Sequence, residues 1–109
     1  MIVTTTNDLE GWRVVGYLGI VSGEVILGVN FIKDFGAAIR NVIGGRSAGY
    51  EEELQDARER SLEEMQQRAR ALRADAVLAV RVDYEVLGPN GGMLMAACSG
   101  TAVRLARVE

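Results

Sequence analysis

The chain has 109 residues, of which 49% are hydrophobic and 25% are charged, and its formal net charge is −3. These values fit one domain over residues 1–109 with a single core. The balanced charge argues against nucleic acid and anionic membranes as partners, because both attract clustered positive charge. No apolar run approaches the roughly 20 residues that a bilayer-spanning helix needs, and no secretory leader is recognisable. Together with a lone cysteine, this predicts a cytoplasmic protein.

The first part of the chain has the composition of strands. Residues 2–5 (IVTT) are β-branched, and residues 12–27 are rich in valine and isoleucine. Three glycines interrupt the second segment: Gly16, Gly19 and Gly23. They indicate bulges or a hairpin, for which residues 22–24 (SGE) are the expected turn.

Two helices are predicted next. Helical spacing of apolar residues over 31–42 predicts a short amphipathic helix that ends before Gly44, and a longer helix is expected over 49–73. Residues three or four apart form its expected buried stripe: Tyr50, Leu54, Ala57, Ser61, Met65, Ala69 and Leu72. Charges that alternate in sign at every fourth position predict a solvated face: Asp56, Arg60, Glu64 and Arg68.

The C-terminal part predicts an antiparallel hairpin. Residues 75–87 alternate between apolar and polar, residues 88–92 (GPNGG) form a turn, and residues 93–108 return as the last strand. One face of the first strand is expected to carry Ala76, Leu78, Val80, Val82, Tyr84 and Val86, and the other Arg81, Asp83 and Glu85. The predicted fold class is therefore α+β, an antiparallel sheet packed against one long helix plus a short helix.

Residues 42–54 (VIGGRSAGYEEEL) resemble a phosphate-binding loop but lack the lysine of that motif. Glu51 and the two glutamates that follow it occupy the first turn of the long helix, where they complement its dipole and would repel a phosphate. A structural turn is the favoured interpretation. There are two alternatives. One is a site for an anion or another small ligand, formed by Arg46, Tyr50 and Glu51. The other is a contact between subunits.

Metal binding has one candidate pair. The chain has no histidine and one cysteine, which excludes the usual zinc, copper and iron–sulfur sites within a single chain. Asp83 and Glu85 lie two residues apart on one strand face and could hold a hard divalent cation, especially if symmetry brings several copies together. The alternative, which we favour, is cross-strand pairing with Arg81 or Arg104.

Catalysis has no clear candidate. Cys98 lies among small apolar residues in MLMAACSGTAV, where a thiol usually serves as core packing, and no histidine is present to activate it. We therefore expect no enzyme.

An ordered set of motifs resembles the YbjQ-like family of small bacterial and archaeal proteins. The motifs are TTT (4–6), SGEVILGVN (22–30), GGRSAGYEEEL (44–54), AR (57–58), EM (64–65), DYE (83–85), GGMLM (91–95) and GTAV (100–103). The resemblance implies an α+β subunit of the YbjQ-like or dodecin-like type that assembles into a homopentamer. The family carries a heavy-metal-binding label and no established catalytic residues. Arg73 departs from the family pattern, which has glycine there.

These observations lead to one functional hypothesis and its alternatives. The hypothesis is that the chain associates with copies of itself into a homo-oligomer, a pentamer, and that this assembly binds a metal ion or a small ligand at the boundaries between subunits. The alternative is a structural or protein-interaction scaffold. An enzymatic function is the weakest of the three hypotheses. The sequence leaves the ligand, the cofactor and the size of the ring open.

Overall fold

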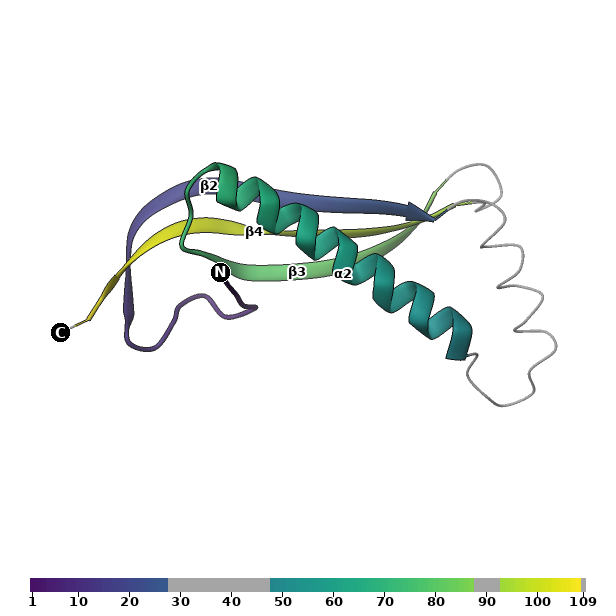
Figure 1. The fold of residues 1–109 in the computed structure, drawn as a ribbon, viewed down its shortest axis with the longest axis horizontal. Coiled ribbons are helices and arrows are strands. Elements are labelled where there is room, and N and C mark those ends of the chain that lie inside the picture. The colour runs from purple at the N-terminus through teal and green to yellow at the C-terminus, as the bar shows by residue number, and fades with distance from the viewer. Residues whose placement is uncertain (28–47, 88–92, 109) are drawn as a thin grey trace.

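The computed structural model describes residues 1–27, 48–87 and 93–108. Within these residues, one helix lies diagonally across one face of a four-stranded sheet with the strand order β1-β3-β4-β2 (Figure 1). The elements are β1 (Ile2–Val3), β2 (Trp12–Leu27), α2 (Ala48–Ala71), β3 (Ala76–Leu87) and β4 (Met93–Arg107). The α+β class is confirmed. The predicted short helix over 31–42 and the turn at 88–92 lie outside the described residues.

The sheet is mixed, so the prediction of an antiparallel sheet is wrong for one strand pair. β2 and β3 both pair antiparallel with β4, whereas β1 runs parallel to β3 with Ile2 opposite Ala76. The two antiparallel pairings include the expected C-terminal hairpin. β1 is separated from β3 by β2 and α2, so no short turn forces it to run antiparallel.

The segment 12–27 is one continuous strand rather than a hairpin with a turn at 22–24. Its bulges lie between Val14 and Gly16 and between Tyr17 and Gly19, as the first two glycines predict. Gly23 has a different role. A Cβ atom at this position would lie 1.9 Å from the backbone oxygen of Ser61, so glycine allows α2 to approach β2 closely.

The core between α2 and the sheet contains most of the predicted stripe. Ala57, Ser61, Met65 and Ala69 are buried, whereas Leu72 is 44% exposed at the end of the helix. The buried residues of α2 pack against apolar side chains of the three long strands: Val21, Val25, Val77, Val80, Ala96, Cys98 and Ala102. Tyr50, the first residue of the predicted stripe, has a side chain outside the described part.

The predicted ladder of charges is present on the solvated side of α2. Arg60 lies 3.9 Å from Asp56, and Arg68 lies 2.7 Å from Glu64. Arg68 also contacts Glu24 of β2 at 3.3 Å, so it links the helix to the edge of the sheet. Because all these side chains are well exposed, each pair contributes at most about 1 kcal/mol.

A bulge in β3 changes which side chains face the helix. Two residues, Ala79 and Val80, lie opposite the single residue Gly100, and Ala79 has a φ of 53°. Before the bulge, Val77 faces α2 and Leu78 packs on the opposite side of the sheet. The sequence predicts that the even-numbered residues from Ala76 to Val86 share one face of the sheet. This prediction is wrong, because the extra residue in the bulge reverses which residues face the helix.

The C-terminus of α2 ends in a Schellman motif. The amide of Ala74 donates to the carbonyl of Ala69 at 3.1 Å, and the amide of Arg73 donates to the carbonyl of Arg70 at 2.9 Å. This closure requires a left-handed residue, and Arg73 supplies it with a φ of 62°. A residue with a Cβ atom is strained in this conformation.

We expect Arg73→Gly to raise the free energy of unfolding by about 0.5–1 kcal/mol, because glycine adopts the left-handed conformation without strain. Chemical denaturation at a fixed protein concentration measures the change. Arg73→Ala is the matched control, because it removes the long side chain but keeps the Cβ atom. Equal stabilisation by both variants would assign the effect to the arginine side chain instead.

Candidate functional site

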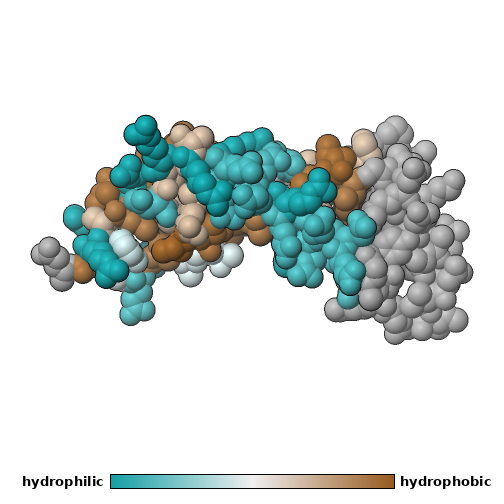
Figure 2. Space-filling model, viewed as in Figure 1, coloured by the Kyte–Doolittle hydropathy of each residue, from teal (hydrophilic) through white to brown (hydrophobic). Residues whose placement is uncertain are grey.

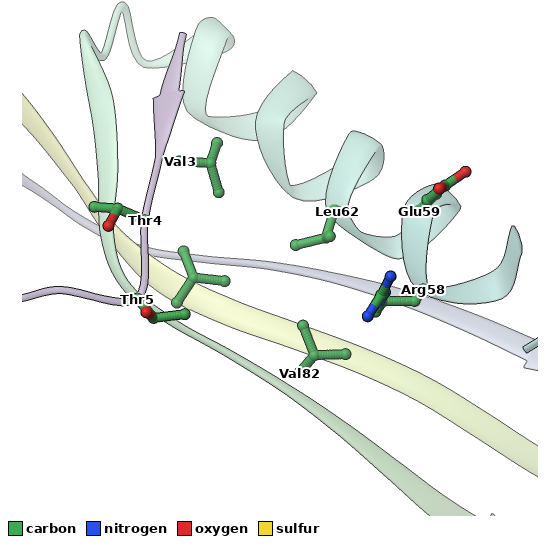
Figure 3. A pocket seen from close by; sticks show the side chains of 8 residues that line it. Val3, Thr4, Thr5, Arg58, Glu59, Leu62 and Val82 are labelled. Atoms are coloured by element: carbon green, nitrogen blue, oxygen red, sulfur yellow. The ribbon is translucent and has the colours of Figure 1, made fainter. Parts of the chain in front are cut away.

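A groove runs between α2, β3 and the N-terminal segment, on the helix side of the sheet (Figure 3). Its main cavity has a volume of about 270 Å³. Eight residues line it: Val3, Thr4, Thr5, Arg58, Glu59, Leu62, Val80 and Val82. The valines and Leu62 supply an apolar wall, while the threonines, Arg58 and Glu59 supply polar groups at its sides, a combination typical of small-molecule sites.

The N-terminal segment is held against β3 by backbone hydrogen bonds at the bulge. The amide of Ala79 donates to the carbonyl of Thr6 at 2.8 Å, and the amide of Val80 donates to the carbonyl of Thr4 at 3.0 Å. The hydroxyls of Thr4 and Thr6 lie 2.8 Å apart and hydrogen bond to each other. The bulge therefore positions the threonines at one side of the groove.

Arg58 connects this cavity to a second one of about 260 Å³. The second cavity is lined by Glu51, Leu54, Gln55, Arg58 and Tyr84. The hydroxyl of Tyr84 lies 3.5 Å from the carbonyl oxygen of Leu54, to which it donates. Tyr84 reaches the helix because the bulge at Ala79 turns the even-numbered residues that follow toward α2.

The guanidinium of Arg58 makes no hydrogen bond or ion pair within residues 1–27, 48–87 and 93–108. Figure 3 shows it on the side of Leu62 and Val82, whereas the carboxylate of Glu59 extends away from them. A cation beside an apolar wall is a natural position for the charged end of an anionic ligand.

The predicted ligand residues Arg46, Tyr50 and Glu51 are only partly covered by the structure. Arg46 and the side chain of Tyr50 lie outside the described residues. Glu51 lies in the first turn of α2, as predicted, and lines the second cavity. The structure therefore places one of the three beside Arg58 and leaves the grouping of the three untested.

Asp83 and Glu85 lie on the sheet face that points away from α2. They are exposed and stand opposite Ala97 and Met95 of β4. Neither forms the expected pair with Arg81 or Arg104 among the described residues, and Arg104 instead lies 3.5 Å from Asp75. No group of three or more acidic or cysteine side chains in the described part is arranged to hold a metal ion.

Cys98 is a core residue. It is 3% exposed, and its thiol donates to the carbonyl oxygen of Ser61 at 3.1 Å. Burial raises the pKa of the Cys98 thiol above its ordinary value, with smaller opposing effects from its hydrogen bonds. The thiol is therefore protonated and covered near neutral pH, which agrees with the expected packing role.

Comparison with known proteins decides the family. A family model described as "Putative heavy-metal-binding" matches residues 1–106. The chain belongs to the YbjQ-like family. It is 57% identical over 107 residues to a UPF0145 protein of Bifidobacterium longum (strain DJO10A), covering 98% of this chain and 97% of that protein. It is also 60% identical over 103 residues to a UPF0145 protein of Listeria grayi, and the alignment covers 94% of this chain and 97% of that protein.

The fold of the YbjQ-like chain also matches a solved structure. A protein of unknown function from Pediococcus pentosaceus ATCC 25745, assigned to the DUF74 family, aligns with a TM-score of 0.61 over 97% of this chain and 98% of that one. The sequence identity is 15%, so this match concerns the fold alone. In the described part of the YbjQ-like chain, no helix has the length and apolar character needed to cross a bilayer.

Sequence reasoning named Arg58 as part of the YbjQ-like motifs but did not place it in a site. The structure shows that motif residues from distant parts of the chain border the two cavities, namely Thr4, Thr5, Glu51, Arg58 and Tyr84. Their order along the chain gives no sign of this, because the grouping depends on how α2 crosses the sheet. The available signal was that Arg58, unlike Arg60 and Arg68, has no acidic residue four positions earlier on the helix.

Proposed function

We propose that this protein is a homo-oligomeric binding protein whose subunits associate through the uncovered face of the sheet and that binds a small ligand in the groove beside α2. The observation that carries the proposal is the apolar surface that one subunit leaves open. Tyr17, Ile20 and Ile26 of β2 are 77%, 83% and 57% exposed. Ile20 and Ile26 stand opposite Thr101 and Met95, on the face away from the helix.

The layering of the described residues supports the same proposal. One helix packs on one face of the sheet, so large apolar side chains on the other face stay exposed, among them Ile20 and Ile26. Exposed apolar surface of this kind is typical of contacts between protein chains. Figure 2 views the helix side and shows hydrophobic surface there as well, beside the hydrophilic side chains of α2.

The edges of the sheet provide a second means of association. β2 is an edge strand of 16 residues, and the described residues place no strand beyond it. On the opposite edge, β1 pairs only with the start of β3. Long open edges are templates for pairing with another chain. Pairing of one edge with the other edge of the next copy would close a ring, and the pentamer implied by the family resemblance is one such ring.

Ile20→Asp tests this association. Because Ile20 is 83% exposed in the subunit, the change should leave the fold intact. In an interface it would bury an unpaired charge at a cost of several kcal/mol, so the assembly should dissociate toward the mass of one chain. Light scattering after size-exclusion chromatography measures the mass. Leu72→Asp is the control, since Leu72 is exposed at the end of α2 away from that face.

A wild-type mass equal to one chain at micromolar concentration would contradict the proposed association. An unchanged mass in Ile20→Asp would show that the subunits associate through another surface. A mass of five chains would support the pentamer specifically.

The second candidate function is binding of a divalent metal ion at subunit boundaries. Asp83 and Glu85 favour it, because both lie exposed on the proposed interface and make no ion pair among the described residues. Copies of this pair could converge where subunits meet and supply the oxygen ligands that hard cations prefer. Calorimetry of the assembled protein with a panel of divalent ions tests this candidate. Heat that Asp83→Asn and Glu85→Gln abolish would support it, and no heat with any ion would reject it.

The proposed function includes no catalytic step. A buried, protonated Cys98 and a sequence without histidine support a binding role rather than nucleophilic catalysis. If the assembly binds neither small ligands nor metal ions, the scaffold alternative gains support.

A further inference from the structure

We infer that the groove between α2, β3 and the N-terminal segment binds a small amphipathic carboxylate. The carboxylate group of the ligand would contact the guanidinium of Arg58, and its aliphatic part would pack against Leu62 and Val82. The inference rests on the proposed binding function and names the ligand class of the same groove. It combines a cation without a partner among the described residues, an apolar wall and a cavity of limited volume, each of which restricts the ligand.

The cation is available because of how the helix places its charges. Residues 51–64 contain seven acidic side chains, yet the residues three and four positions from Arg58 are Leu54, Gln55, Ser61 and Leu62. Arg60 and Arg68 both have an acidic residue four positions earlier and pair with it. Arg58 has no such neighbour, and no residue in the described part of the chain accepts a hydrogen bond from its guanidinium, so we expect its donors to serve a ligand.

The wall of the groove selects for an apolar body. Leu62 and Val82 line the cavity from two different elements and are partly buried, whereas Val80, which also lines it, is 5% exposed. A ligand that covers them gains about 25 cal/mol for each Å² of apolar surface removed from water. A bare inorganic anion would leave that surface uncovered and would bind more weakly.

The cavity sets the size and adds a polar group. Its volume of about 270 Å³ lies just below the range of roughly 300–1,000 Å³ that is typical of ligand pockets. Thr5 lines it, and the Thr5 side chain makes no hydrogen bond within the described residues, so its hydroxyl can also donate to the ligand. A planar carboxylate matches the fork of donors of an arginine better than a neutral head group does.

Calorimetry and NMR titration of the intact assembled protein test the inference with three probes: hexanoate, hexanol and inorganic phosphate. Hexanoate should bind more tightly than hexanol or phosphate, and it should perturb the amides of α2 near Arg58. Arg58→Gln should weaken hexanoate binding about tenfold or more, because the charge-assisted hydrogen bonds are lost, and should leave hexanol binding unchanged. Arg58→Lys should retain part of the affinity.

Arg60→Gln is the matched control, since Arg60 lies on the same helix but pairs with Asp56. It should leave hexanoate binding unchanged. No hexanoate binding, phosphate binding as tight as hexanoate binding, or equal losses in the Arg58 and Arg60 variants would each overturn the inference. The mass of every sample is measured in parallel. Loss of assembly in Arg58→Gln would assign Arg58 to a subunit contact and overturn the inference, whereas a monomeric wild type that binds hexanoate would contradict only the proposed assembly.

Discussion

Gly23→Ala is expected to lower the free energy of unfolding by about 3 kcal/mol or more, because a Cβ atom meets a closer contact there than at any other described glycine. The new Cβ atom would lie 1.9 Å from the carbonyl oxygen of Ser61 and 2.8 Å from the amide nitrogen of Met65. Both atoms belong to the backbone of α2, so no side chain can rotate away. The helix must move off the sheet and lose packing along its buried stripe.

Gly16→Ala is the matched control in the same strand. Its nearest neighbours would be the Cβ and Cγ atoms of Arg104 at 3.6 and 3.7 Å, which is ordinary contact. We expect a change within about 0.5 kcal/mol there. Thermal and chemical unfolding at one protein concentration measure both variants, because assembly would make the midpoint depend on concentration. A Gly23→Ala protein as stable as the wild type would show that α2 does not pack this closely.

Met65→Ala is expected to cost about 2–5 kcal/mol of unfolding free energy. Met65 is fully buried, is among the largest such side chains and packs in the cluster that joins α2 to the three long strands. Truncation removes apolar contacts and leaves a cavity that the close backbone approach at Gly23 prevents from collapsing.

Met65→Leu should cost less than about 1.5 kcal/mol, since leucine nearly preserves the volume. The difference in unfolding free energy between Met65→Ala and Met65→Leu separates the cost of the cavity from the cost of replacing methionine. Equal losses in both would indicate that the thioether makes a specific interaction, and no loss in Met65→Ala would contradict the burial of this side chain.

The groove depends on the same packing. α2 approaches the sheet closely where Gly23 lies beneath it, and the valines of β3 after the bulge form the wall opposite Arg58. A change that lifts the helix should therefore widen the groove and weaken ligand binding as well as stability. Gly23→Ala consequently reports on the fold, whereas Arg58→Gln reports on the ligand site.

The sequence by itself determined the elements whose signal is periodic and local. The stripe of Ala57, Ser61, Met65 and Ala69 follows the helical period and is buried as predicted. The pairing of β3 with β4 follows from the alternation over residues 75–87 and from the glycine-rich segment that precedes the last strand. Such patterns repeat over many residues, so each repeat strengthens the prediction.

Only the tertiary structure decided the features that depend on one residue and its partner in another element. The bulge at Ala79 reverses the facing of β3, and no periodicity marks it, because it exists opposite Gly100 of the next strand. Gly23 reads as a turn residue in the sequence but serves a close approach to Ser61. Of the predicted ligand residues, Glu51 lines the second cavity. Arg58 meets Thr4 in the first cavity and Tyr84 in the second only because α2 crosses the sheet.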